Sequence, residues 1–571
     1  MGGNITKEVG QRKRDEREEL INEMEKQLGL AEDHPDDAVY THTSPEEIVA
    51  NLKSRKNGWT AERVMIAFIR SACAAHRKTN CLTEILFAEA LEEARKLDKD
   101  YAATGIADGP FWGLPSSFKD TYNIKGVDTS LGCSPHCFKP TEKLEDEGGL
   151  VQLFRQGGGI PFCKTNIPQT LLAFECRNPV FGPTTNPYTS ARTCGGSSGG
   201  EAALIALNGS PMGWGSDIGG SLRIPASYSG VCGLKPVKGR WPTKGQRSAT
   251  PGFEGIQGIV GPMGRNVDDL AFGARNMLTL AQESTARING EQLIHMPWKE
   301  VELPKKLRVG YFTEDNCIKA SPACVRAVEE SVAALRKAGH EVVRFEPPDV
   351  SEALKVFAGL TSADGYKTLL GNIGPDPMEP SMRLVTIGSR IPRWLAWFAH
   401  WLLDSVLKDH MFASTFATSR PKSVEEFWKY TRRRDVYANA FRKLVWEDKK
   451  FDMILCPVQA VPAVEHGRTN FLSPLCIGTV LYNVVDSTVG VIPVTHVDRE
   501  RDATPPDYLE GSQGSWLLEK RVYEGGPEKA AYDAEKMHGL PVGVQIVGQA
   551  WEEEKVLAIM KVVEELVAYE P

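Results

Sequence analysis

Two serines, Ser197 and Ser221, lie in or directly beside a stretch that is unusually rich in glycine. Nine of the 53 glycines fall between residues 195 and 220, a stretch that contains Ser197 and ends beside Ser221. It has no lysine, which excludes a phosphate-binding loop, and its glycine spacing fits a dinucleotide fingerprint poorly. Apolar residues interleave with the glycines, which excludes a flexible linker. Because glycine permits positive φ and close approach to amide groups, the pattern favours a nucleophile loop. In such a loop the N–H groups of 217–221 would surround a developing oxyanion beside Ser221 Oγ.

A serine nucleophile needs a base, and two kinds of base are open to this chain. No histidine occurs between residues 137 and 294, although His136 or a distal histidine could fold towards Ser221. Lys119 is the other candidate, because it follows an apolar segment where burial would disfavour its charged form. Lowering its pKa from about 10.4 to near 7 costs roughly 4–5 kcal/mol. Ser197 could then relay a proton between Lys119 and Ser221. The structural alternative for Lys119 is an ion pair with Asp120 or another acid.

Several motifs resemble those of the amidase signature family. They are Gly-Gly-Ser-Ser-Gly-Gly-Glu at 195–201, Gly-Ser-Asp-Ile-Gly-Gly-Ser-Leu-Arg-Ile-Pro at 215–225 and Cys-Gly-Leu-Lys-Pro at 232–236, with upstream matches at 113–120 and 164–169 and later ones at 261–263, 452–457 and 539–545. The resemblance covers roughly residues 60–570. It implies that Ser221 is the nucleophile, that Ser197 is a bridging serine on a cis peptide bond, and that Lys119 is the general base and then the acid. It also implies an oxyanion hole formed by the N–H groups of Ile218, Gly219, Gly220 and Ser221. The main-chain carbonyl of Leu171 would orient the substrate, and the supporting polar residues would be Ser198, Asp217 and Arg223.

Short apolar segments alternate with helical ones, which predicts an α/β architecture. Strands are expected at 114–118, 159–163, 307–312, 341–345, 452–458, 489–497 and 541–547, and helices throughout 45–99 and at 323–338 and 550–568. The resemblance implies a mixed, twisted sheet of about eleven strands sandwiched between helices. Residues 1–50 are expected to form a solvated arm and an amphipathic helix that carries Ile21, Met24 and Leu28 at helical spacing. Residues 51–571 would form the catalytic domain, with a membrane-facing helical cap at about 385–415.

Composition excludes several classes of protein. A net charge of −7 gives no general attraction to nucleic acid. The 12 cysteines are too dilute for a disulfide scaffold, so reduced thiols are expected. The groups Cys133–His136–Cys137 and Cys73–His76–Cys81 lack zinc-site spacing, and the resemblance implies neither a metal nor an organic cofactor. The first fifty residues contain no apolar run, so neither a signal peptide nor an N-terminal transmembrane helix is expected.

An aromatic segment near residue 400 has the pattern of a helix lying in a membrane interface. Its uncharged run from 394 to 403 is about half a bilayer span and has cationic residues at both ends. A buried core helix or a dimer contact is the alternative. The N-terminal Met-Gly-Gly-Asn-Ile-Thr fits a myristoylation pattern with Gly2 as acceptor, and a single acyl chain would anchor the protein only marginally. The aromatic residues of the expected membrane-facing cap near residue 400 are Trp394, Trp397, Phe398 and Trp401.

These features predict a serine hydrolase that cleaves linear amides, and also esters, through an acyl-enzyme. Within the family, the chain resembles both the fatty acid amide hydrolases and the general acetamidases. The expected substrates are fatty acid amides such as N-acyl ethanolamines and primary fatty amides, cleaved by a peripheral, monotopic homodimer on the cytoplasmic side of membranes. The alternatives are a short-chain acetamidase, the glutaminase subunit of a tRNA-dependent amidotransferase, and a non-catalytic membrane scaffold.

Overall fold

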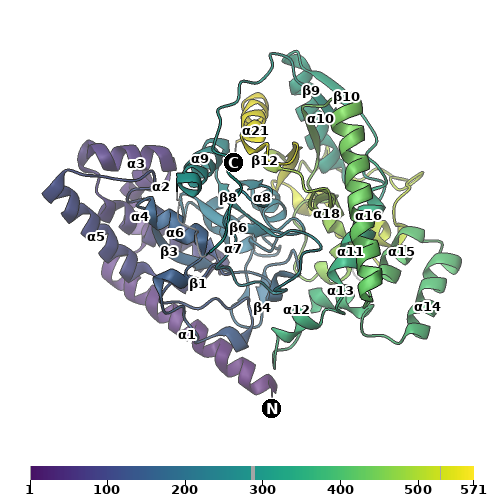
Figure 1. The fold of residues 1–571 in the computed structure, drawn as a ribbon, viewed down its shortest axis with the longest axis horizontal. Helices are drawn as coiled ribbons and strands as arrows, with labels where there is room; N and C mark the ends of the chain where they lie inside the picture. Colours follow the sequence, from purple (N-terminus) through teal and green to yellow (C-terminus); the bar gives the residue numbers. More distant parts are fainter. Residues whose placement is uncertain (1, 284–289, 527–528, 571) are drawn as a thin grey trace.

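The computed structural model describes residues 2–283, 290–526 and 529–570, and an eleven-stranded sheet lies at its centre (Figure 1). The strand order is β1-β3-β2-β6-β8-β7-β12-β13-β11-β9-β10. Strand β2 runs parallel to β3 and β6, strand β9 runs parallel to β10 and β11, and the other neighbours are antiparallel. The sheet is therefore mixed, as predicted. Its strands are β1 (Leu82–Ile85), β2 (Pro115–Lys119), β3 (Ile160–Thr165), β6 (Gly213–Asp217), β7 (Cys232–Lys235), β8 (Ile259–Gly264), β9 (Arg308–Tyr311), β10 (Glu341–Arg344), β11 (Met453–Pro457), β12 (Val489–His496) and β13 (Pro541–Val547), while β4 (Arg177–Asn178) and β5 (Gly182–Pro183) form a separate pair.

Helices cover both faces of this sheet. A Cβ added at Gly490 of β12 would lie 1.9 Å from Met560 Sδ of α21, and one added at Gly543 of β13 would lie 3.0 Å from Ser227 Oγ of α8. Gly490 pairs with Ile546, three residues from Gly543, so α21 and α8 pack on opposite faces. These glycines let the helices approach the strands closely. The helices are α1 (Gly2–Leu28), α2 (Ala38–Thr41), α3 (Pro45–Ser54), α4 (Ala61–Thr79), α5 (Phe87–Thr104), α6 (Gly149–Gln156), α7 (Gly199–Ala206), α8 (Arg223–Ser229), α9 (Val267–Glu283), α10 (Pro322–Lys337), α11 (Val350–Thr361), α12 (Lys367–Gly371), α13 (Arg383–Ile387), α14 (Arg393–Trp401), α15 (His410–Thr418), α16 (Val424–Arg442), α17 (Thr469–Leu472), α18 (Ile477–Val484), α19 (Trp516–Tyr523), α20 (Ala534–Met537) and α21 (Glu553–Val567).

The seven strands expected from the sequence coincide with β2, β3 and β9 to β13, and the two later helices coincide with α10 and α21. Four strands of the eleven-stranded sheet (β1, β6, β7 and β8) and the separate pair β4 and β5 were not predicted. Strand β6 contains two glycines, and β8 contains two glycines and a proline, and these residues ordinarily weaken a strand pattern. The expectation that 45–99 is helical throughout was wrong, because β1 interrupts it and pairs antiparallel with β3. The expected start of a helix after Ser44 is confirmed, since Ser44 Oγ accepts from the Glu47 N–H.

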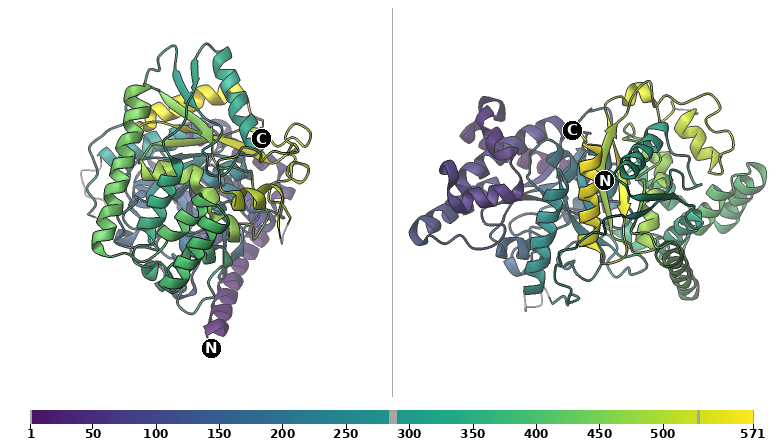
Figure 2. Two further views of the ribbon diagram at one scale, coloured as in Figure 1. Left: turned by 90° about the vertical axis from the view of Figure 1, so that its right-hand side faces the viewer. Right: turned by 90° about the horizontal axis from the view of Figure 1, so that it is seen from above.

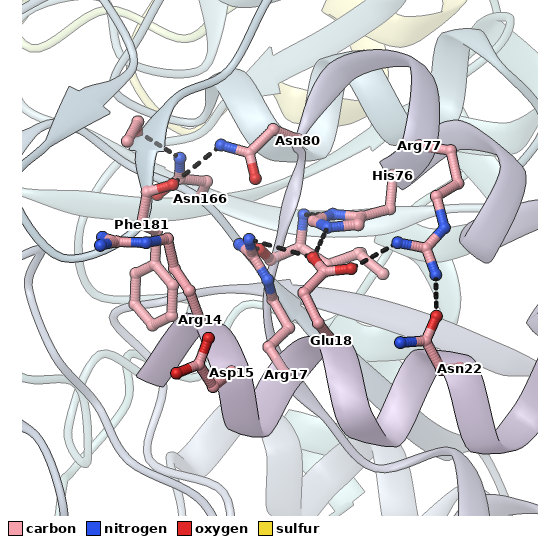
Figure 3. A network of polar contacts seen from close by, with 12 residues as sticks. Arg14, Asp15, Arg17, Glu18, Asn22, His76, Arg77, Asn80, Asn166 and Phe181 are labelled. Atoms are coloured by element: carbon pink, nitrogen blue, oxygen red, sulfur yellow. Dashed lines mark hydrogen bonds and ion pairs between the residues drawn. The ribbon is translucent and has the colours of Figure 1, made fainter. Parts of the chain in front are cut away.

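The N-terminal helix α1 packs against α4 and β1, and the expectation of a solvated arm was wrong. Lys13 is buried, with its Nζ 3.0 Å from a Glu84 carboxylate oxygen and 3.2 Å from Asp128 Oδ2. Arg17 is also buried and donates to the Leu82 carbonyl at 2.8 Å. Figure 3 shows the polar side of this contact, where Glu18 of α1 faces His76 and Arg77 of α4.

The two ends of the molecule carry different helices. Figures 1 and 2 show α1, α3, α4 and α5 at one end of the sheet and α14 and α15 at the other. Over the described part of the chain, no helix combines the length and the apolar composition needed to cross a membrane. All 12 cysteines are free thiols, as expected.

Candidate active site

Two neighbouring parallel strands bring Lys119 to the glycine-rich segment. Strands β2 and β6 pair in register at Phe118 and Trp214, so Lys119 ends its strand close to Ser216. Lys119 Nζ donates to Ser216 Oγ at 2.9 Å and lies 3.4 Å from the Ser216 carbonyl oxygen. Parallel pairing therefore places the lysine at the carboxyl end of β6, directly before the loop that leads to Ser221.

The amino group of Lys119 also contacts the first of the two predicted serines. Its Nζ lies 2.7 Å from Ser197 Oγ, and Lys119 is wholly buried. Burial lowers the pKa of Lys119 from 10.5 to about 7, against smaller opposing effects of Asp217 and two other groups. The alternative of an ion pair with Asp120 is excluded, because Asp120 Oδ1 lies 2.7 Å from Lys164 Nζ and no ion pair of Lys119 occurs among the described residues.

Close backbone packing holds Ser197 beside the lysine. The Gly196–Ser197 peptide bond is cis, as the resemblance implies. A Cβ at Gly196 would lie 2.9 Å from the Ala173 carbonyl oxygen, and one at Gly200 would lie 2.4 Å from the Asn166 nitrogen. Only glycine fits these approaches, so the glycine cluster lets the Ser197 loop enter the crowded centre of the fold.

Ser221 lies on the turn between β6 and α8, where it adjoins the Ser197 loop. The Ser198 N–H donates to the Ser221 carbonyl at 3.1 Å, which ties the two loops together. Ser198 Oγ also accepts from the Ser216 N–H at 3.4 Å. Ser221 is partly exposed and lines the same cavity as Ser197. The two predicted serines therefore border one open space, with Lys119 behind Ser197.

A buried ion pair fixes the shape of the loop that holds Ser221. Arg223 Nη2 lies 3.0 Å from Asp217 Oδ1, and neither side chain is accessible to solvent. Burial alone would raise the pKa of the Asp217 carboxyl, but the Arg223 guanidinium and the hydrogen-bond donors around it hold that pKa well below its usual range. Asn483 adds a further donor at 2.9 Å. Asp217 is therefore an anion whose ion pair and hydrogen bonds hold the loop in this conformation.

The four N–H groups expected in the oxyanion hole are not equivalent. The Gly220 N–H donates to Asp217 Oδ1 at 2.9 Å, so it is directed to a carboxylate and the expectation for Gly220 needs correction. Gly220 has φ of +121°, and a Cβ there would lie 2.2 Å from Thr479 Oγ1. Ile218, Gly219 and Ser221 remain as candidate donors. Gly220 instead supplies the bend that presents them.

Leu171 lies opposite this loop. It has a positive φ of 67° and follows Thr170, whose φ is 56°. Leu171 and Ser221 line the same two cavities. The preceding Gln169 is anchored, because its Oε1 accepts from the Glu379 N–H at 2.9 Å. The backbone of Leu171 is thus held at the edge of the site in an unusual conformation.

Two residues near Lys119 were not singled out from the sequence. The sequence around Ser216 does not single it out as a site residue, although its place in the Gly-Ser-Asp motif before Ser221 could have drawn attention to it. Glu201 is fully buried at the start of α7 and accepts from Ser117 Oγ at 2.6 Å and from Thr165 Oγ1 at 2.7 Å. Burial raises the pKa of Glu201 to about 7. Glu201 thereby fastens the helix after Ser197 to strands β2 and β3.

Two cavities of different character meet at Ser221. One has a volume of about 170 Å³ and the other about 500 Å³. The smaller is lined mainly by apolar side chains, including Leu354, Phe357, Leu384, Phe412, Phe416 and Val480. The larger contains many polar side chains, including Thr121, Thr243, Gln246, Arg247 and Thr368. His136, the other candidate base, contacts Arg247 and Asn372 instead of a serine of the site.

A family model described as "Amidase" matches residues 63–557. The chain belongs to the amidase signature family. Fatty-acid amide hydrolase 1 of Sus scrofa is 34% identical over 519 residues, which make up 90% of this amidase and 84% of that protein. An acetamidase of Aspergillus oryzae is 31% identical over 551 residues, covering 94% of this amidase and 91% of its relative.

The fold of this amidase also matches a solved structure. A fatty acid amide hydrolase superposes with a TM-score of 0.83 at 24% identity, and the match covers 99% of this amidase and 95% of that chain. The predicted amidase signature fold and a hydrolytic activity towards amides are therefore confirmed.

Proposed function

We propose that this amidase hydrolyses fatty acid amides, with Ser221 as nucleophile, Ser197 as proton relay and Lys119 as base. The observation that carries the proposal is the apolar cavity, which joins Ser221 to helices at the end of the molecule where tryptophans are exposed. A short-chain acetamidase has no use for such a cavity. The Lys119–Ser197 contact of 2.7 Å supports the proton path.

In the proposed reaction Ser221 Oγ attacks the amide carbonyl carbon while its proton passes through Ser197 to neutral Lys119. The oxyanion is stabilised by the N–H groups of Ile218, Gly219 and Ser221. Collapse of the tetrahedral intermediate breaks the C–N bond, and the leaving amine receives the proton back along the same path. Water then attacks the acyl-enzyme and releases the carboxylic acid and free Ser221.

The position of the aromatic cap supports a lipid substrate. Trp394 and Trp397 are 70% and 67% exposed, so the alternative of a buried core helix is excluded for α14. Helix α14 packs against α15, and α15 supplies Phe412 and Phe416 to the apolar cavity. A helix inserted in the membrane interface through its tryptophans would thus lie next to the lining of the acyl site.

Three further expectations belong to this proposal. A peripheral, monotopic association with the cytoplasmic side of membranes would deliver the lipid to α14 and α15. Myristoylation of Gly2, where α1 begins, would add a second membrane signal, while Met1 lies outside the described residues. A homodimer would be compatible with membrane binding if its interface spares α14.

The experiment compares hydrolysis of oleamide, an N-acyl ethanolamine and acetamide, with and without phosphatidylcholine vesicles. We expect both lipids to be cleaved at least tenfold faster than acetamide in terms of kcat/KM, and we expect Ser221→Ala to lose labelling by a fluorophosphonate probe. Faster turnover of acetamide would favour the acetamidase alternative. Co-purification with other subunits would favour a glutaminase, and wild-type protein that resists the probe would favour a non-catalytic scaffold.

A further inference from the structure

The turn that carries Leu171 to the edge of the site is supported by residues far away in the sequence. Thr170 and Leu171 both have positive φ, and non-glycine residues keep such a conformation only where their surroundings hold it. The Thr170 N–H donates to the Leu131 carbonyl at 2.9 Å, and Thr170 Oγ1 lies 3.8 Å from Met382 Sδ. The place of Leu171 beside Ser221 therefore depends on contacts outside the turn itself.

Gln169 joins this turn to residues 376–382, which we call the bracket segment. The Gln169 side chain is buried, and its Oε1 accepts from the Glu379 N–H at 2.9 Å, while its Nε2 donates to the Pro377 carbonyl at 3.2 Å. A side-chain amide carries both a donor and an acceptor, so it pairs with this main chain as a neighbouring strand would. Two simultaneous hydrogen bonds give the turn and the bracket segment one relative position.

The bracket segment is anchored on its other side by the carboxylate of Asp376, which is buried. Asp376 Oδ2 accepts from the Ser134 N–H at 2.6 Å, and the Ser134 hydroxyl donates to Oδ1 of the same carboxylate. Thr6 of α1 is also buried and donates from its Oγ1 to Asp376 Oδ1 at 2.8 Å. Helix α1 thus reaches the bracket segment 370 residues away in the sequence, and through it the turn that carries Leu171.

We propose that Gln169, Asp376 and Thr6 are positioning residues that hold the Leu171 carbonyl where it selects amides over esters. The inference rests on the proposed Ser221 chemistry and on the orienting role expected for that carbonyl. A carbonyl oxygen only accepts, so it binds the N–H of an amide substrate and finds no donor on the oxygen of an ester. A turn that has lost its support therefore loses rate towards amides and little rate towards esters.

The test measures kcat/KM for N-oleoyl ethanolamine and 2-hydroxyethyl oleate in the same detergent micelles. These substrates share the acyl chain and the hydroxyethyl group, and they differ only in the N–H that replaces the ester oxygen. The amide-to-ester ratio is compared among wild type, Gln169→Met, Asp376→Asn, Thr6→Val and Thr6→Ser, the last of which keeps the hydroxyl. Gln11→Met is the matched control, because the exposed Gln11 side chain on α1 donates to Asp15 of the same helix.

We expect Gln169→Met to lower this ratio at least tenfold, Asp376→Asn at least fivefold and Thr6→Val at least threefold, while Thr6→Ser and Gln11→Met keep the wild-type value. The rate towards the ester should stay within about threefold of wild type. The midpoint of the pH profile set by Lys119 should not move, because the base is untouched. Thermal unfolding checks each variant, and Asp376→Asn and Thr6→Val decide the question if Gln169→Met does not fold.

An amide-to-ester ratio that stays at the wild-type value in folded Gln169→Met overturns the positioning role, even if both rates fall together. A ratio that falls in Gln169→Met but not in Asp376→Asn or Thr6→Val overturns the part assigned to α1. In either case, cleavage of N-oleoyl ethanolamine by wild type shows that the proposed function still holds. If neither oleoyl substrate is cleaved, the fatty-acyl proposal fails, and N-acetylethanolamine and 2-hydroxyethyl acetate give the same ratio independently. An enzyme that cleaves neither pair overturns both.

Discussion

Lys119 Nζ lies 2.7 Å from Ser197 Oγ, and both side chains are buried. No described carboxylate forms an ion pair with this lysine, so desolvation dominates its environment and its pKa falls to about 7. A buried lysine that has lost its proton is a base, whereas one paired with an acid would stay charged. The contact with Ser197 gives that base a direct path towards the nucleophile.

The first prediction concerns the pH dependence of the rate. Neutral Lys119 accepts the proton, and the fraction that is neutral rises with pH through about 7. We expect kcat/KM for an amide to increase about tenfold per pH unit well below this pKa and to level off above it. A stopped assay between pH 5 and 9 checks this profile. A rate that is flat across this range would contradict the role of Lys119.

Removing the lysine should stabilise the fold. At pH 7 the unfolded chain keeps a proton on Lys119 that about half of the folded molecules have released, because the folded pKa is about 7 and the ordinary value is 10.5. We expect Lys119→Met to raise the free energy of unfolding at pH 7 by at most roughly 4–5 kcal/mol. The advantage should shrink as pH rises from 7 to 10.5, since wild type regains stability there. Urea unfolding of both proteins at several pH values measures the difference, and a less stable variant would argue against desolvation as the cause.

The sequence predicted the two serines, the lysine and the α/β sheet because local glycine patterns and apolar runs encode them. It did not predict the hydrogen bond from the Gly220 N–H to the Asp217 carboxylate, because the direction of a backbone N–H depends on the conformation of the folded loop. The burial of Lys13 was also hidden, since charged side chains ordinarily indicate solvent and its partner Glu84 is 71 residues away. Tertiary pairing, which a single sequence does not display, decides these features.

The ion pair beneath the nucleophile loop gives the next prediction. Asp217→Asn keeps the shape of the side chain but leaves the Arg223 guanidinium buried without its counter-charge. We expect the free energy of unfolding to fall by about 3–5 kcal/mol and the rate to fall with it, because the loop loses its anchor. Chemical denaturation and kcat on the same preparations measure both effects. Glu62→Gln, which breaks an exposed ion pair with Arg95, should change stability by less than about 1 kcal/mol. Equal effects of the two substitutions would contradict the structural role of the buried pair.

Docking of α1 depends on a second buried ion pair. Lys13→Met leaves Glu84 and Asp128 close together without the ammonium that separates their charges. We expect α1 to open more readily, with hydrogen exchange of its amides at least a hundredfold faster, which corresponds to about 3 kcal/mol. The control is Lys26→Met, because Lys26 is exposed on the same helix. Unchanged exchange in Lys13→Met would mean that the apolar contacts of Ile21 and Met24 suffice to dock α1.

The exposed tryptophans of α14 give the last prediction. Replacing Trp394, Trp397 and Trp401 with serine removes apolar surface that is 70%, 67% and 43% exposed, without opening a cavity in the core. We expect binding to phosphatidylcholine vesicles to weaken at least tenfold, while kcat/KM for a soluble short-chain ester stays within about twofold of wild type, because interfacial tryptophans act through the bilayer. Trp428→Ser on α16 is the matched control, since Trp428 is 69% exposed at a different site. Light scattering of the same variants tests the alternative that these tryptophans form a dimer contact. In that case their replacement would convert a dimer into monomers and leave vesicle binding unchanged.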